Sequence, residues 1–339
     1  MRRLALAAIA TGVASLAAAG NGPAAPVPTF TFVGGGDIAL VGAGATPATF
    51  SAIRRFLHGN LVMANLEGTL AADGSAKCHP YGQDGCFTFR AAPGSARVLR
   101  AAGFDVLNVA NNHALDYGEK AHLETLAALR AAHIAYDGLP HQITVVKAGP
   151  AKVALVGFAP YTWAASLTDI PAARALVEKA HTKADVVVVY MHAGAEGAAA
   201  EHVTGQPETF LGEKRGNPRA FAHAMISAGA SVVFASGPHV VRGLEWFHGH
   251  PIAYSLGNLA GNGTLATGGV LSLSALLTLE LRADGRFVSG CIVSLRLSAE
   301  GTPSYDPSGA AAKLMADLSN DDFGPAAVRL GADGAMLSR

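Results

Sequence analysis

Short apolar runs rich in β-branched residues alternate along the chain with longer, alanine-rich segments of helical period. Runs such as VALVGF and VVVVYM are apolar at every position, which is typical of strands buried on both faces of a sheet. The pattern predicts strands over residues 29–33, 61–65, 106–109, 153–158, 185–191 and 231–235. It predicts helices over residues 46–58, 95–102, 120–133, 170–181 and 218–228. This alternation indicates an α/β fold.

The pattern changes in the C-terminal part, where apolar runs follow one another without helical segments. We expect antiparallel strands here, over residues 252–255, 269–281 and 287–297. Ala283-Asp284-Gly285, between the last two, is typical of a hairpin turn. No linker divides residues 29–300, which we take as one domain. Residues 301–339 are more polar and are interpreted as a tail with a short helix over 310–318.

The N-terminus has the features of an export signal. Arg2 and Arg3 are followed by 33 residues without Asp, Glu, Lys or Arg, and the first 16 of these are apolar and alanine-rich. A positive start, a short apolar stretch and small residues before a cleavage point predict a signal peptide over residues 1–19. A membrane anchor is the alternative, but 16 residues fall short of the roughly 20 needed to span a bilayer. Residues 20–28 then form a flexible lead-in, and the protein is exported to the periplasm, cell envelope or medium.

The cysteines agree with export. Cys78 and Cys86 flank a seven-residue polar stretch, HPYGQDG, that must turn. A disulfide between them would persist outside the cytoplasm. A metal clip that uses His79 is the alternative, although a zinc site would need further cysteines nearby. Cys291 lies in an apolar run and is interpreted as a buried free thiol.

Composition narrows the function. Lys plus Arg and Asp plus Glu are both 25, so the formal net charge is zero, and a nucleic-acid partner is not expected. The chain is 50% hydrophobic and 15% charged, which is enough apolar material for a large core. The phosphate-binding loop GxxxxGK[ST] and the nucleophile elbow GxSxG are both absent from the sequence.

Polar side chains gather where the predicted strands end. Each of five strands is followed within a few residues by a carboxylate, amide or imidazole, in the series Asp37, Asn65, Glu67, Asn111, Asn112, His113, His192 and His239. Ligands of open α/β sheets bind at the carboxyl ends of the strands. A turn or helix cap explains any single one of these residues. Five in series point to one shared crevice.

Several of these residues lie in recognisable strings. GGGDIAL, ANLEGTL, FDVLNVANNHALDYG, YMHAG, GPHVV and IAYSLGNL occur in the order seen in capsule-synthesis proteins of the CapA type, so the chain resembles that family over about residues 29–300. CapA-type proteins are associated with poly-γ-glutamate export and are similar to calcineurin-like metallophosphoesterases. The resemblance implies a four-layer α/β/β/α sandwich with two mixed sheets, helices outside and a metal site at the strand ends.

The resemblance also implies roles for single residues. The implied metal ligands are Asp37, Glu67, Asn112, His192 and His239. Glu67 would take the place of a bridging carboxylate, and His113 would be the general acid that protonates the leaving oxygen. Carboxylate, amide and imidazole ligands suit Mn, Fe or Zn, as one ion or two.

Two positions depart from the phosphoesterase pattern. Ala39 and Gly237 stand where imidazoles are usual, so each nominal metal shell lacks one ligand. Residues with expected supporting roles are Asn65, Asp116, Glu196, His250 and Asn258. Among these, Asp116 is one candidate to fill a vacancy and water is the other, and Glu196 is expected to hold the His192 ring. Arg90 and Lys77 are expected to contact an anionic substrate.

Two classes of function follow. In the first, the protein is a metal-dependent hydrolase that acts on a phosphoester or an anionic envelope polymer. In the second, it is a non-catalytic binding or scaffold component of a capsule export assembly, with membrane-bound synthesis or export proteins as partners. The retained Asn112-His113 pair favours chemistry, because a scaffold does not need a proton donor beside a ligand. The missing imidazoles favour a degenerate site.

Overall fold

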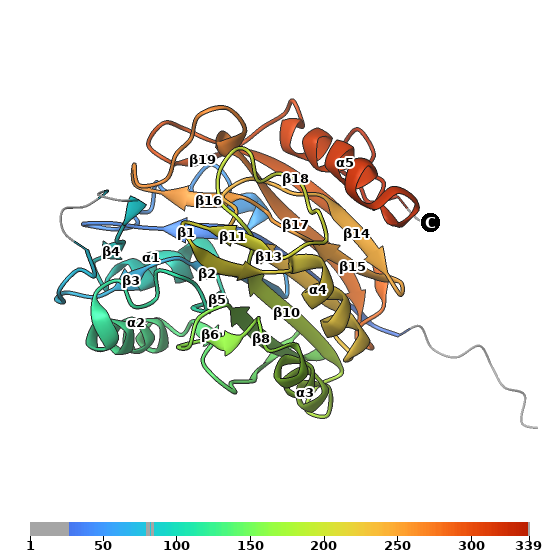
Figure 1. The fold of residues 1–339 in the computed structure, drawn as a ribbon, viewed down its shortest axis with the longest axis horizontal. Helices are drawn as coiled ribbons and strands as arrows, with labels where there is room; N and C mark the ends of the chain where they lie inside the picture. Colours follow the sequence, from blue (N-terminus) through green and yellow to red (C-terminus); the bar gives the residue numbers. More distant parts are fainter. Residues whose placement is uncertain (1–26, 79–81, 83–84, 338–339) are drawn as a thin grey trace, which may run out of the picture.

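The protein, described here by a computed structural model over residues 27–78, 82 and 85–337, is built on two large mixed sheets (Figure 1). The predicted signal peptide and residues 20–26 of the lead-in lie outside the described residues. The first sheet has the order β19 (Pro303–Tyr305), β18 (Phe287–Leu297), β17 (Leu273–Arg282), β1 (Thr29–Ala39), β2 (Leu61–Leu66), β5 (Val106–Asn108) and β6 (Ala135–Asp137), with β16 (Asn258–Gly261) paired to the end of β1. The second has the order β14 (Leu244–Phe247), β15 (His250–Ala253), β13 (Val232–Ser236), β10 (Val186–His192), β8 (Ala151–Ala159) and β7 (Thr144–Ala148), with β9 (Ala165–Ser166) beside β8.

Within the part of the chain that the structure describes, two small ribbons and five α-helices accompany the sheets. The ribbons are β3 (Thr69–Leu70) with β4 (Arg90–Ala91), and β11 (Glu208–Phe210) with β12 (Glu213–Gly216). The helices are α1 (Ser95–Ala102), α2 (Gly118–Ala131), α3 (Ile170–His181), α4 (Pro218–Ser227) and α5 (Ala310–Phe323). Short 3-10 turns are η1 (Arg54–Phe56), η3 (Gly269–Ser272) and η4 (Gly324–Ala326).

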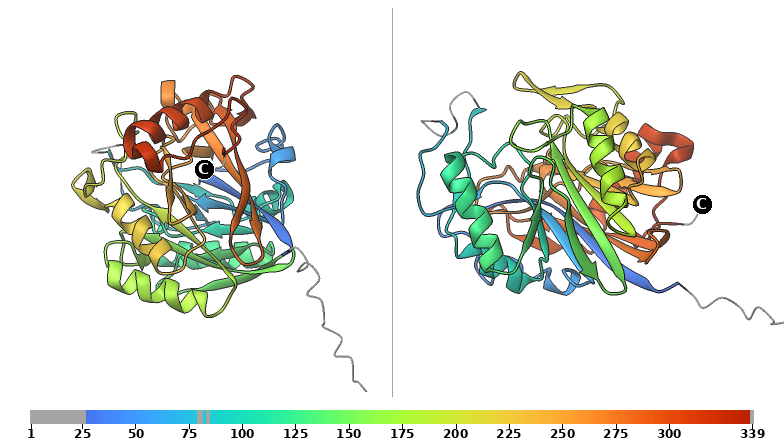
Figure 2. Two further views of the ribbon diagram at one scale, coloured as in Figure 1. Left: turned by 90° about the vertical axis from the view of Figure 1, so that its right-hand side faces the viewer. Right: turned by 90° about the horizontal axis from the view of Figure 1, so that it is seen from below.

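Three hydrophobic clusters define the layers. The central cluster lies between the sheets and joins Phe32 and Met63 of the first to Val188 and Phe234 of the second. On the outer face of the first sheet, α1 and α2 pack in a second cluster, and on the outer face of the second sheet, α3 and α4 pack in a third. Helices therefore cover both flanks of the strands (Figure 2). The expected four-layer α/β/β/α sandwich is confirmed.

The glycine run before Asp37 lets β1 bend beneath the site. A Cβ on Gly36 would lie 1.8 Å from the carbonyl oxygen of Gly257, so only glycine fits. The backbone N–H of Asp37 donates to that same carbonyl at 3.1 Å. The pairing of β1 with β2 shifts register between Gly34 and Asp37. The glycine run therefore lets the backbone of β1 lie close to the backbone at Gly257. The register shift places the Asp37 side chain at the carboxyl ends of the strands.

The structure corrects two predicted elements. Residues 46–58 form successive turns and η1 instead of an α-helix. Thr46 N–H donates to Thr49 Oγ1 (3.0 Å) and Ser51 Oγ donates to the Ala48 carbonyl (2.9 Å). Hydroxyls that bond to nearby backbone in this way compete with helical hydrogen bonds. The strand predicted over 269–281 starts four residues later, because η3 occupies its beginning.

The C-terminal part belongs to the sandwich. The strands expected over 269–281 and 287–297 are β17 and β18, which pair antiparallel and extend the first sheet. The strand expected over 252–255 is β15 of the second sheet, which pairs antiparallel with β14 and parallel with β13. The predicted short helix is α5, which is longer than expected and buries Ala311 and Met315 in the central cluster. The described residues beyond 300 therefore pack against the sandwich through β19 and α5.

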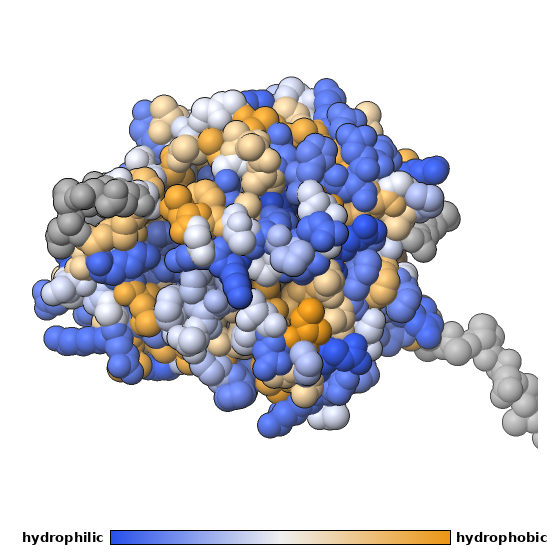
Figure 3. Space-filling view, in the orientation of Figure 1, coloured by the Kyte–Doolittle hydropathy of each residue, from blue (hydrophilic) through white to orange (hydrophobic). Residues whose placement is uncertain are grey.

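The face of the molecule seen in Figure 3 has no large continuous hydrophobic patch among the described residues. On the face seen in Figure 3, hydrophobic residues form small groups among hydrophilic ones. Within the described residues, no helix is both long and apolar enough to cross a membrane.

The predicted disulfide between Cys78 and Cys86 is present, and Cys291 is a half-buried free thiol.

Candidate metal centre at the strand ends

The site lies where the carboxyl ends of parallel strands from both sheets meet. Asp37 is near the end of β1, His192 ends β10, and Ser236 ends β13. Asn65 lies one residue before the end of β2, and Asn258 begins β16 opposite Asp37. These five side chains are buried, so the polar edge that we expected from the strand-end pattern is one enclosed cluster.

Asp37 is the best satisfied carboxylate of this cluster. It accepts hydrogen bonds from Asn65 Nδ2 (2.7 Å), Ser236 Oγ and the Gly237 backbone N–H (3.0 Å). Burial acts to raise its pKa, but His239 and His192, together with Ser236, outweigh burial and lower the pKa to about 2. Asp37 is therefore a fixed anion.

Glu67, just after β2, has the opposite environment. Both of its oxygens are buried and have no hydrogen-bond partner among the described residues. Burial, and then the charge of Asp37, raises the pKa of Glu67 well above its ordinary value. A buried carboxylate without partners is costly unless a cation compensates it. The residue is arranged for a ligand that the protein itself does not provide.

His239 closes the cluster from the loop after β13. Its backbone is in the left-handed region (φ 61°), and its Nδ1 donates to Asn258 Oδ1 at 2.8 Å. Nε2 then lies 3.8 Å from Glu67 Oε1 and 3.5 Å from Glu196 Oε2. Burial lowers the pKa of His239, but Glu67, Asp37 and Glu196 together raise it well above the ordinary value. The left-handed backbone is a local cost that aims the ring inward.

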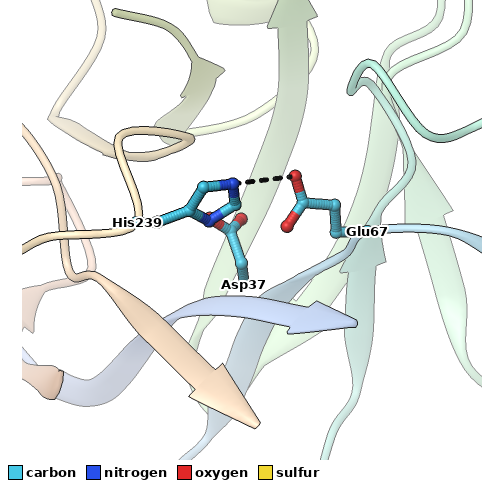
Figure 4. Close-up of side chains that lie close together, drawn as sticks. All are labelled: Asp37, Glu67 and His239. Carbon is cyan, nitrogen blue, oxygen red and sulfur yellow. Dashed lines mark ion pairs between the residues drawn. The ribbon is translucent and has the colours of Figure 1, made fainter. Parts of the chain in front are cut away.

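The three side chains converge on one point. Ligand atoms of Asp37, Glu67 and His239 lie within 4.8 Å of one another, and the side chains point toward one another (Figure 4). His192 Nε2 is 3.7 Å from Glu67 Oε1, and burial lowers the pKa of His192 to about 3, so the imidazole is neutral. His192 Nε2 and Asn112 Oδ1 are buried without a partner among the described residues. These unpaired donor atoms fit a divalent transition metal.

The two departures from the phosphoesterase pattern are built into the packing. Ala39 is buried with Phe89 and Leu265 in a small apolar cluster. Gly237 has φ 116°, and a Cβ there would lie 3.3 Å from the His192 ring. Ala39 is therefore part of an apolar cluster, and any side chain at position 237 would press on the His192 ring and need an unfavourable backbone. The number of ions stays a prediction.

His113 and Asp116 form a pair beside the cluster. His113 Nδ1 donates to Asp116 Oδ2 at 2.7 Å, and both side chains are buried. Burial lowers the pKa of His113, although Asp116 opposes this. The Asp116 oxygens contact His113, Phe89 and Lys77, and Asp116 is not among the three residues whose ligand atoms converge. Its role as a substitute ligand stays a prediction.

A cleft of about 720 Å³ opens onto Asn112, His113 and Glu196. Its walls include the stacked rings of Tyr161 and Trp163, 4.8 Å apart. Glu196 does not hold the His192 ring. It contacts His239 and pairs with Arg215, whose guanidinium lies 2.7 Å from Glu196 Oε1.

Two residues expected at the site lie elsewhere. His250 begins β15, at the edge opposite the site, and its ring bonds to the Ser231 carbonyl. Arg90 stacks on Tyr117 (4.4 Å) and donates to the Gly74 carbonyl. Asn65 supports Asp37, and Lys77 forms an ion pair with Asp116.

Arg215 and Ser236 are site residues that sequence reasoning missed. Ser236 ends the strand just before GPHVV, so its position at a strand end was a usable signal. Arg215 lies on β12, in a polar stretch without a clear strand pattern. No sequence signal marks it.

The structure is a two-sheet α/β/β/α sandwich with carboxylates and imidazoles at its strand ends, which is the arrangement that the sequence resemblance implied. Residues 37–262 match the family described as bacterial capsule synthesis protein PGA_cap. The chain belongs to this family. The resemblance inferred from the sequence strings is confirmed.

Curated relatives carry related names. The chain is 29% identical over 232 residues to the capsule biosynthesis protein CapA of Bacillus anthracis, covering 62% of this chain and 51% of that one. It is 30% identical over 181 residues to the PGA biosynthesis protein CapA of Bacillus subtilis (strain 168), covering 48% and 44%. The chain thus spans about half the length of these two relatives.

Among solved structures, a putative 5'-nucleotidase from Staphylococcus aureus, in complex with alpha-ketoglutarate, is similar with a TM-score of 0.45 and 14% identity. The similarity covers 86% of this chain and 58% of that one. A 5'-nucleotidase precursor from Thermus thermophilus gives a TM-score of 0.44 at 14% identity, covering 86% and 59%. These likenesses are distant and do not bear on the site.

Proposed function

We propose that this protein is an exported, metal-dependent hydrolase that acts on an anionic envelope polymer of the poly-γ-glutamate kind or on a phosphoester. The observation that carries the proposal is that both oxygens of Glu67 and Nε2 of His192 are buried without hydrogen-bond partners among the described residues, where ligand atoms of Asp37, Glu67 and His239 converge. The unpaired Oδ1 of Asn112 directly precedes, in the chain, the hydrogen-bonded His113–Asp116 pair. Family membership supports the polymer. The disulfide supports export, since such links persist outside the cytoplasm.

The chain's own residues divide the work. Asp37, Glu67 and His239 would hold the ion, with His192 and Asn112 beside them. Mn, Fe or Zn bound there would supply Lewis acidity. Asp116 holds the Nδ1 proton of His113, so Nε2 is the nitrogen that exchanges a proton with the substrate. The cleft in front of His113 receives the substrate.

Both cations of the cleft are already engaged by carboxylates. Lys77 pairs with Asp116, and Arg215 pairs with Glu196 and Glu213. An anionic substrate therefore depends on the bound ion for attraction. This makes turnover and substrate binding equally dependent on metal.

His113→Gln tests the proposal. This variant should keep the fold and the metal but lose about 10²–10⁴-fold in turnover, the usual contribution of a positioned proton donor. The assay compares aryl phosphodiesters with good and poor leaving groups, because proton donation matters most when the leaving oxygen is basic. The loss should therefore grow with leaving-group pKa.

A non-catalytic binding role in a capsule export assembly is the second function, and the two missing imidazoles favour it. It is adopted if the metal-loaded wild type turns over neither ester type nor poly-γ-glutamate. In that case His113→Gln leaves the capsule phenotype unchanged. Substitutions of Asp37 or Glu67 that remove the metal would still change the capsule phenotype.

A further inference from the structure

Asp116 is held mainly by the two ends of the disulfide loop, which we define as residues 78–86. Lys77, just before the loop, places Nζ 2.7 Å from Asp116 Oδ1 and donates its backbone N–H to the Asp116 carbonyl at 2.8 Å. Phe89, just beyond the loop, donates its backbone N–H to Asp116 Oδ2 at 2.6 Å. Each end of the loop thus fixes one carboxylate oxygen, and His113 shares Oδ2.

The two ends differ in how they are held. The Phe89 carbonyl accepts from the Thr69 backbone N–H (3.0 Å) beside the β3–β4 ribbon, and its ring packs on the His113 ring at 4.2 Å. Apart from Asp116, the hydrogen bond of Lys77 within the described residues goes to the Asn112 carbonyl (3.2 Å). The Lys77 side chain is 37% exposed. The β3–β4 ribbon therefore holds Phe89 in place. In the described part of the chain, Lys77 has no such support from a strand, and the Cys78–Cys86 disulfide ties its segment to the segment that leads to Phe89.

The cross-link matters because of the energetics of this ion pair. Holding a flexible, partly exposed lysine in one position costs side-chain entropy, so such a pair is weak on its own. A disulfide reduces the number of conformations open to the residue next to it. The buried Asp116 carboxylate, in turn, depends on its hydrogen-bond and ion-pair partners for its orientation. Its orientation decides which ring nitrogen of His113 carries the proton.

We propose that the Cys78–Cys86 disulfide positions the His113–Asp116 pair, and that Lys77 is the positioning residue through which it acts. The link keeps Lys77 on Oδ1, which leaves Oδ2 for His113 Nδ1. This inference rests on the proposed role of His113, but its main measurement needs no substrate. If the proposal holds, the Nδ1–H tautomer of His113 depends on a disulfide that lies outside the metal cluster.

The test measures the tautomer of His113 by proton–nitrogen correlation NMR on the full chain loaded with Zn²⁺, which is diamagnetic. The wild type should show mainly the Nδ1–H tautomer. In Cys78→Ser/Cys86→Ser the ratio of tautomers should fall about three- to tenfold, the range expected for one hydrogen bond. Lys77→Met should move the ratio in the same direction. Cys291→Ser, which removes the free thiol, is the matched control and should leave the ratio unchanged.

Other outcomes would overturn the inference. An unchanged tautomer ratio with a lower melting temperature means that the disulfide only stabilises the fold. If the double serine variant does not fold, Lys77→Met decides, and an unchanged ratio there contradicts the proposal. A complete loss of Zn²⁺ binding would also contradict it, because Asp37, Glu67 and His239 lie on other elements.

The result is separable from the proposed function. A wild type that hydrolyses nothing, yet shows the expected tautomer response, removes the hydrolase and keeps the positioning role. A wild type that hydrolyses esters with His113 in the other tautomer keeps the hydrolase and removes the positioning role.

Discussion

The two halves of the site are held in different ways. Asp37, like His192, extends directly from a buried strand, so the sheets themselves fix its direction. His113 and Asp116 lie on a loop, and their orientation depends on Lys77, Phe89 and a disulfide. The strands therefore fix Asp37 and His192 directly, and Glu67 and His239 lie one to three residues beyond strand ends. The proton-donor pair, by contrast, depends on contacts between loops. Substitutions should separate the two.

The largest effect is expected for Glu67→Gln. Because neither Glu67 oxygen has a hydrogen-bond partner among the described residues, the substitution breaks no hydrogen bond there and removes only the longer ion-pair contacts of Oε1 with His192 and His239. Metal affinity should fall at least about 100-fold, more than for a residue that only supports a ligand. The raised pKa of Glu67 means that its charged form destabilises the fold, so the metal-free variant should melt no lower than wild type at pH 8. Calorimetric titration with Zn²⁺ or Mn²⁺ and thermal unfolding measure both quantities. A stability loss equal to the loss of binding would make Glu67 a structural residue.

A smaller effect is expected for Arg215→Met, which leaves Glu196 without its ion pair beside His239. Metal affinity should fall about tenfold, the lower end of the range for residues that orient ligands. Arg90→Met is the matched control, because Arg90 contacts Tyr117 and Gly74 away from the site. Equal effects of the two substitutions would show that Arg215 acts only through general charge.

The third substitution changes the pH dependence of stability and not metal binding, and it compares two carboxylates at strand ends of one sheet. Asp137, like Asp37, lies at the carboxyl end of a parallel strand, but neither of its buried oxygens has a partner among the described residues. Burial raises its pKa to about 8. The folded state therefore holds a proton that the unfolded chain releases near its ordinary pKa of 3.8, and stability falls as pH rises between these values. Asp137→Asn should remove a slope of up to about 1.4 kcal/mol per pH unit. Denaturant unfolding from pH 5 to pH 8 measures it, and identical slopes in both proteins would contradict the assignment.

The sequence indicated the strand-held half of the site better than the loop-held half. Asp37 and His192 could be predicted because continuous apolar strands end at them, and parallel strands bring their ends together. The partners of Glu196 and Asp116 could not, because they depend on how the loops fold back over the sheets. Arg215 was missed because β12 is short and polar.

The fold shows the same division. Helices 95–102 and 170–181 were predicted with their observed bounds, since α1 and α3 each bury one apolar face. The helix expected over 46–58 was wrong, because Thr49 and Ser51 bond to nearby backbone groups. Local hydroxyl contacts of this kind are not visible in the periodicity of apolar residues.

The packing around Ala39 and Gly237 also bears on the history open to this chain. A histidine at position 39 would need smaller side chains at Phe89 and Leu265 first, and each of those changes would loosen a buried cluster. A histidine at position 237 would need a left-handed backbone and would crowd His192. Each single substitution is therefore expected to cost stability before any ligand is gained. A richer ligand set at these two positions would need several coordinated changes in the surrounding packing, so the packing limits the routes by which the ligand set of this site can evolve.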